Sequence, residues 1–186
     1  DIMAPATTIF SPRSHVATGT MCTKNETAAV NLGPDYADCG GTSMAAPHVA
    51  GLVALLRQHY INSGILSPTA ALLKASIIAS GQEMLYGYPS MTSGWGRANI
   101  STVLPSSGKV VWYDDETAGV VTGQTYTATL PRVQGGAPLK VVLVWTDYQG
   151  TPGVLPHLVN DLDLELISPG GIVFHGNDFA APYDDT

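Results

Sequence analysis

Residues 40–51 read GGTSMAAPHVAG and combine a glycine turn with the start of an apolar run. Gly40 and Gly41 allow a tight turn, because glycine adopts backbone angles that other residues avoid. We expect Thr42 to be the N-cap of a helix, which places Ser43 in the first helical turn. Unpaired backbone N–H groups and the positive end of the helix dipole gather there. A serine at that place can attack a carbonyl carbon while a nearby N–H group stabilises the oxyanion.

The residues that follow are apolar on nearly every side of a helix, which we expect to run from about residue 42 to residue 60. Pro47 lies close enough to the start to remove only one early hydrogen bond. Gly64 is suited to end the helix in a left-handed conformation. Such a helix is predicted to lie in the middle of a sizeable domain.

Residues 41–51 resemble the nucleophile signature of the subtilisin-like serine peptidases, over eleven positions. The resemblance implies that Ser43 is the nucleophile that forms an acyl-enzyme. The alternative is an ordinary buried serine at the start of a helix. The length of the match favours the nucleophile, because it extends far beyond a short serine motif.

The order of the following segments also resembles that family. Residues 2–9 are predicted to be extended, and residues 11–40 to form a surface loop. A second helix is predicted with Ser67 as N-cap and Pro68 as first residue. The segment 94–99, GWGRAN, is similar to a Gly-x-Gly-x-x-Asn segment of the family. The resemblance implies that residues 1–104 are the C-terminal part of an α/β catalytic domain with a parallel sheet.

The sequence changes character at residues 105–108, PSSG, which indicate a linker. Period-two patterns then predict strands at 125–130, 139–145 and 161–166, and a hairpin that returns at 172–174. We therefore expect residues 105–186 to form an antiparallel β-sandwich or jelly-roll domain. This half resembles the C-terminal β-barrel of some alkaline subtilases, which continues further. The chain is accordingly expected to be a C-terminal fragment.

A serine nucleophile needs a base and a carboxylate that orients the base. The five candidate bases are His15, His48, His59, His157 and His175. Helix geometry excludes His48 and His59, which lie about 7.5 Å and 24 Å along the axis from Ser43. The position of His15 stays open, and the last two are expected to be ordinary histidines of the β-domain. The resemblance implies that the aspartate, the histidine and an oxyanion-binding asparagine precede Asp1. The chain alone is therefore predicted to be inactive, and its expected partner is the upstream half or a second chain.

Composition limits the remaining possibilities. The chain has 186 residues, 45% of them hydrophobic and 12% charged, which is typical of a globular protein. A net charge of −7 argues against nucleic acid as a partner. No apolar run reaches the length of a membrane span. The resemblance implies a secreted protein that acts on proteins or peptides.

Two lesser sites stay open in the sequence. Cys22 and Cys39 are either a disulfide or two free thiols. Three acidic residues share one face of a predicted strand: Asp161, Asp163 and Glu165. Calcium would neutralise them, with Asn160 or Asp178 as further ligands, unless the face is simply solvated. The metal ligands are therefore left unassigned, and catalysis itself requires no cofactor.

Two functions remain. The chain is predicted to be part of a secreted subtilisin-like serine endopeptidase that hydrolyses peptide bonds through Ser43. The alternative is a non-catalytic structural or binding module, that is, a pseudoenzyme or an inactive fragment.

Overall fold

The computed structural model describes residues 1–16, 22–24, 35–87, 89–105, 110–130, 138–155 and 157–178. It divides the chain into two compact units, Asp1–Val142 and Leu143–Thr186, which are considered separately. The border lies well beyond residue 104, where the sequence predicts the domain border. The assignment of residues 1–104 and 105–186 to two domains therefore stays a prediction.

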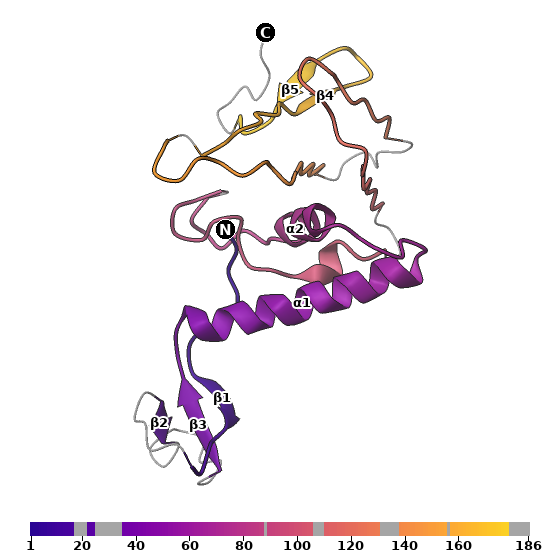
Figure 1. Ribbon diagram of the computed structural model, residues 1–186. Coiled ribbons are helices and arrows are strands. Elements are labelled where there is room, and N and C mark those ends of the chain that lie inside the picture. Colours follow the sequence, from indigo (N-terminus) through magenta and orange to yellow (C-terminus); the bar gives the residue numbers. More distant parts are fainter. Residues whose placement is uncertain are drawn as a thin grey trace. The chain divides into compact units, whose positions relative to one another are not determined.

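A small sheet forms at the start of the first unit (Figure 1). Its order is β1 (Ile9–Pro12), β3 (Tyr36–Cys39) and β2 (Thr23–Lys24), and both pairings are antiparallel. The surface loop predicted from residue 11 was wrong at residues 11 and 12, which belong to β1, because β1 is an edge strand and tolerates a proline at its end. The predicted surface loop is likewise wrong at residues 36–39, which form the central strand of the sheet.

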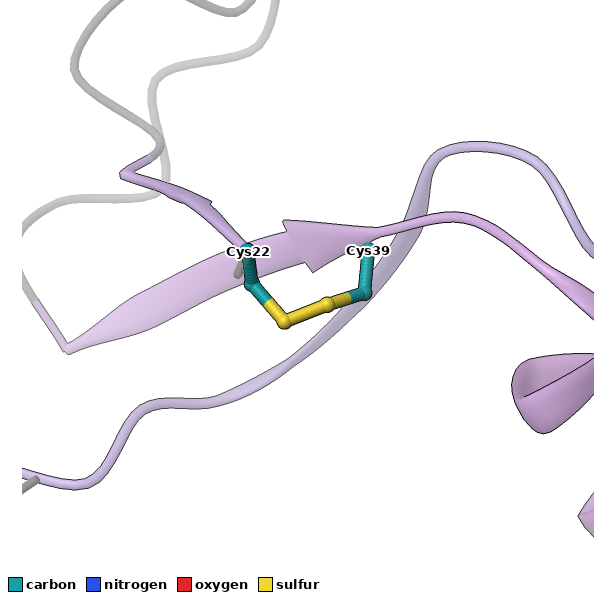
Figure 2. The surroundings of a disulfide bond; sticks show 2 residues. All are labelled: Cys22 and Cys39. Atoms are coloured by element: carbon teal, nitrogen blue, oxygen red, sulfur yellow. A yellow bond between two sulfur atoms is a disulfide. The ribbon is translucent and has the colours of Figure 1, made fainter. Parts of the chain in front are cut away.

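Cys22 and Cys39 form a disulfide, which answers the question that the sequence left open (Figure 2). Their Cα atoms are 4.8 Å apart. The bond joins the last residue of β3 to the residue immediately before β2. It therefore crosslinks the strand that leads into the long helix.

Helix α1 (Thr42–Asn62) confirms the predicted helix and ends two residues beyond the expected residue 60, but its N-cap is Gly41 rather than Thr42. Gly41 has a φ of 137°, which side chains disfavour, and no side chain caps the helix. Only Leu56 and Tyr60 of this helix are buried. Within the described residues α1 packs on one face and leaves Leu55 61% exposed, so its position in the middle of a sizeable domain stays a prediction.

Helix α2 (Ala70–Ala79) packs against α1 and forms the core with it. The buried cluster consists of Leu56, Tyr60, Leu72 and Ile77. The N-cap of α2 is Thr69, whose hydroxyl accepts a hydrogen bond from the Leu72 N–H at 3.1 Å. The predicted cap at Ser67 was two residues early, because the threonine hydroxyl makes the cap bond and Pro68 is buried ahead of the helix.

The glycine segment packs beside the first residues of the chain. Met3 donates its N–H to the Gly96 carbonyl at 2.8 Å and accepts from the Ala98 N–H at 2.9 Å. A Cβ on Gly96, which has a φ of 86°, would lie 2.1 Å from the Gln82 carbonyl oxygen. This close approach explains the glycine. Across the described ranges, the only parallel pairing is the single bridge between Met3 and Arg97, so the predicted parallel sheet is not seen there.

A short 3₁₀ helix (Ile100–Thr102) ends this part, and the second unit contains one hairpin. Strands β4 (Glu165–Ile167) and β5 (Val173–His175) pair in antiparallel register, with Leu166 opposite Phe174. The predicted hairpin is confirmed, but its first strand covers only 165–167 and not the predicted 161–166. Within 110–130 and 138–155 the described backbone forms no strand, so the strands expected at 125–130 and 139–145 were wrong. These segments have no neighbouring strand within the described ranges with which to exchange backbone hydrogen bonds. The β-sandwich is therefore not confirmed.

Candidate functional site

Ser43 lies in the first turn of α1, and its side chain is exposed. The first N–H groups of a helix have no acceptor within the helix, so the N–H of Ser43 itself can face a ligand. Among the described residues, the structure gives the Ser43 hydroxyl no hydrogen-bond partner. The serine is therefore accessible for chemistry, and the alternative of a serine sealed inside the core does not hold.

Backbone contacts fix the turn that presents this serine. The Gly41 N–H donates to the Ala6 carbonyl at 2.7 Å, and the Gly41 carbonyl accepts from the Met44 N–H at 3.0 Å. A Cβ on Gly40 would lie 3.3 Å from the Ala6 carbonyl oxygen, tighter than most such contacts. Both glycines therefore serve the close approach of two chain segments. Because Cys39 immediately precedes them, the turn extends directly from the crosslinked strand β3.

Pro47 and His48 act on the helix backbone near Ser43. Pro47 lacks an N–H, so the Ser43 carbonyl does not receive the usual helical hydrogen bond. The Nδ1 atom of the next residue, His48, donates to the Met44 carbonyl at 2.7 Å. The ring is thereby engaged by its own helix, which agrees with the prediction that His48 is not the base.

The other histidines have partners or surroundings of their own. His15 pairs through Nε2 with Asp35 at 3.0 Å, and the His59 ring centroid lies 5.6 Å from that of Tyr60. In the second unit, His175 lies 3.6 Å from Glu165, and the side chain of His157 is exposed. Within the described part of the chain, no histidine or carboxylate is hydrogen-bonded to Ser43. A base and its orienting carboxylate are thus not assembled here.

The three acidic residues alternate with half-buried ones as the sequence predicted, but only Glu165 lies in a strand, and Asp161 and Asp163 precede β4. Asp161 and Asp163 are exposed and alternate with half-buried leucines, while Glu165 lies beside His175. The ranges that the structure describes contain no group of three or more His, Cys, Asp or Glu side chains placed to hold a metal ion. The calcium site stays a prediction.

The sequence profile of the Subtilase family matches residues 1–96, just over half of the 186 residues. The chain belongs to the Subtilase family. The matched residues include the small sheet, the glycine turn with Ser43, and both long helices.

Two curated proteins resemble this subtilase chain. A Dictyostelium discoideum protein named serine protease/ABC transporter B family protein tagA is 26% identical over 188 residues, covering 90% of this chain and 10% of that protein. An extracellular serine protease of Serratia marcescens is 30% identical over 105 residues, covering 53% of this chain and 9% of that protein. The chain therefore spans about a tenth of the length of these relatives. Among the described helices of the subtilase chain, none is long and apolar enough to cross a membrane.

Sequence reasoning missed the role of Asp147 in the second unit. Its carboxylate accepts hydrogen bonds from the N–H groups of Tyr148, Val159 and Asn160 and from the Asn160 side-chain amide, at 2.8–3.0 Å. The bond from the Val159 N–H is the main cause that lowers the pKa of Asp147, and the other donors add to it. The carboxylate joins two chain segments twelve and thirteen residues apart. No period or spacing in the sequence signals such a contact.

Proposed function

We propose that this chain is part of a subtilisin-like serine endopeptidase whose nucleophile is Ser43. The observation that carries the proposal is the exposed serine in the first turn of α1, directly after a glycine turn held by backbone bonds. This turn lies within the residues that match the Subtilase family. The printed names of both relatives include serine protease, which supports the same reaction class.

The chemistry follows from the position of the serine. The Ser43 Oγ attacks the carbonyl carbon of a peptide bond, and a histidine base takes the hydroxyl proton. The backbone N–H of Ser43 donates to the oxyanion that forms. The base then gives its proton to the leaving amine, and an acyl-enzyme remains until water hydrolyses it. We infer that the histidine, its aspartate and the oxyanion-binding asparagine come from the upstream half of the catalytic domain or from a second chain.

Labelling with a fluorophosphonate probe tests this proposal. In a complete enzyme that contains the upstream half, the probe should label Ser43, and Ser43→Ala should abolish both labelling and peptide hydrolysis. Rate losses on the order of 10⁶-fold are known for the loss of a triad serine. Ser67→Ala, which changes an exposed serine outside the turn, is the control and should label like the parent.

The isolated chain should label slowly or not at all, because no described side chain activates Ser43. Rapid, heat-sensitive labelling of the isolated chain would show that the base lies within these residues. Labelling of the complete enzyme that survives Ser43→Ala would remove Ser43 as the nucleophile.

The alternative of a non-catalytic module is favoured by one observation, the lack of a described histidine at Ser43. The coding sequence upstream of Asp1 separates the two functions. An Asp-Thr-Gly or Asp-Ser-Gly segment and a His-Gly-Thr segment would support the peptidase. Their absence would identify a pseudoenzyme.

Three finer features belong to the same proposal. The enzyme is secreted, which the name of the extracellular Serratia relative supports. Residues 105–186 are part of a β-sandwich or jelly-roll domain, a proposal that the antiparallel β4–β5 hairpin supports. Calcium binds at the acidic face around Asp161 and Asp163. Equal melting temperatures in calcium and in chelator would contradict the calcium site. Enzyme retained inside the producing cell would contradict secretion.

A further inference from the structure

Helix α2 carries no charges of its own that suit its ends. Its sequence, AALLKASIIA, has no acidic residue in the first turn and no basic residue in the last turn. A helix exposes unpaired N–H groups and partial positive charge at its start, and unpaired carbonyls and partial negative charge at its end. Opposite charges placed at these ends stabilise the helix. In α2 any such charge has to come from elsewhere in the chain.

Asp115 supplies the negative charge at the start of α2. Its Oδ2 accepts the backbone N–H of Thr69 at 3.0 Å, and its Oδ1 accepts the Thr69 hydroxyl at 2.5 Å. That hydroxyl in turn accepts the N–H of Leu72, which is the N-cap bond. The carboxylate therefore orients the capping side chain and lies at the positive end of the dipole. It reaches this place from 46 residues further along the chain.

Lys140 supplies the positive charge at the other end. Its Nζ atom donates to the Ala79 carbonyl at 3.1 Å and to the Gly81 carbonyl at 2.8 Å. Ala79 is the last residue of α2, so its carbonyl is one of those that the helix leaves unpaired. A lysine that binds the last carbonyls compensates both the lost hydrogen bonds and the dipole.

We propose that Asp115 and Lys140 form a charge clamp, which holds the chain after the linker onto both ends of α2. The two charges have the signs that the two helix ends require, and both come from the downstream side of residues 105–108. Tyr113 adds an apolar contact, since its ring meets the Tyr60 ring edge-on at 4.9 Å. The compact unit that carries Ser43 therefore includes Asp115 and Lys140. The clamp does not depend on the chemistry at Ser43.

Hydrogen exchange followed by mass spectrometry tests the clamp in the full chain. Asp115→Asn should speed amide exchange about five- to tenfold in peptides that cover residues 69–73, because an uncharged acceptor holds Thr69 less well. Lys140→Met should do the same for peptides that cover residues 78–82. The matched controls are Asp114→Asn, an acid that accepts from Tyr126 instead, and Lys74→Met in the middle of α2. Neither control should change exchange at either end by more than about twofold.

Charge reversal separates the clamp from a simple ion pair between the two residues. If Asp115 and Lys140 acted on each other, exchanging them as Asp115→Lys with Lys140→Glu would restore stability. In the clamp each charge acts on its own helix end, so the double variant should melt lower than either single variant, by about 4 °C or more. Salt at about 1 M should reduce that difference, because the exposed part of the interaction is screened. Restored stability in the double variant, or unchanged exchange at both ends in the single variants, would overturn the proposal.

Discussion

The two ends of helix α1 differ in exposure and in what holds them. At its start, Ser43 is exposed and the turn is held by backbone hydrogen bonds and a crosslinked strand. Near its end, Leu56 is fully buried and Tyr60 is 3% exposed. The hydroxyl of Tyr60 bonds to Ser76 of α2 at 2.7 Å, and Ser76 donates to the Leu72 carbonyl. The start of α1 is exposed to solvent, and its end is packed into the core.

One helix therefore combines an exposed start, which carries Ser43, with a buried end that packs against α2. Seventeen residues separate Ser43 from Tyr60, roughly 26 Å along the axis. Core substitutions at the buried end should therefore change the free energy of unfolding without changing the structure of the glycine turn that presents Ser43. Changes near the turn should alter the position of Ser43 while the core stays packed. The predictions below test this division.

The largest expected effect on stability is at the buried end. Leu56→Ala should lower the free energy of unfolding by about 2–5 kcal/mol, because it removes apolar contacts and leaves a cavity. Leu55→Ala is the matched control, since Leu55 is the preceding leucine and is 61% exposed. It should cost less than about 1 kcal/mol. Urea unfolding of both variants measures the contrast, and equal losses would show that α1 is not anchored on one face.

The next largest expected effect on stability concerns the Cys22–Cys39 disulfide, which lies beside the glycine turn that presents Ser43. Replacing both cysteines, Cys22→Ala with Cys39→Ala, should lower the free energy of unfolding by ~3 kcal/mol, because the unfolded chain gains freedom. Hydrogen exchange should rise in β3 and at the start of α1 but not around Tyr60. In the complete enzyme the same variant should lower kcat more than it changes KM, since the turn is less well positioned. Faster exchange at the buried end alone would contradict the division of α1.

The sequence predicted local features of this arrangement well. A run of apolar residues with a glycine turn at its start located α1, and serine and turn residues located the β4–β5 hairpin. The exposed serine at the helix start followed from the same run. These features depend on neighbouring residues only, so the pattern contains what is needed to find them.

Features set by distant residues were not predictable in the same way. The N-cap at Gly41 depends on its bond to Ala6, and the cap at Thr69 depends on a carboxylate 46 residues away. The Asp147 contacts and the pairing of Cys22 with Cys39 are likewise made across the chain. Apolar composition states what a helix can bury and not which neighbours cover it, so the exposure of Leu55 could not be derived from the α1 pattern alone.

A smaller effect is expected at the hydrogen bond between the helices. Tyr60→Phe should lower the free energy of unfolding by about 1 kcal/mol, because the ring stays packed and only the hydroxyl bond is lost. Ser76 keeps its bond to the Leu72 carbonyl, so little else is left unpaired. Tyr86→Phe, at a tyrosine that is 59% exposed, is the control and should have no measurable effect. A loss of several kcal/mol in Tyr60→Phe would indicate that the hydroxyl organises more than this one contact.

The smallest effect is the alkaline pH dependence of the same residue. Burial raises the pKa of Tyr60 above 10.0, assisted by the nearby Tyr113 and Asp115. A raised pKa means that the folded chain favours the neutral phenol, so this stabilisation is complete below pH 10 and is lost as the pH rises through the folded pKa. The loss is at most about 1.4 kcal/mol per pH unit in that window. Unfolding of the parent and of Tyr60→Phe between pH 8 and pH 11 measures it, because other tyrosines, including Tyr126, titrate in both proteins. The parent's advantage should be constant up to pH 10 and shrink above it, whereas an advantage that grows with pH would mean that the buried end favours the phenolate.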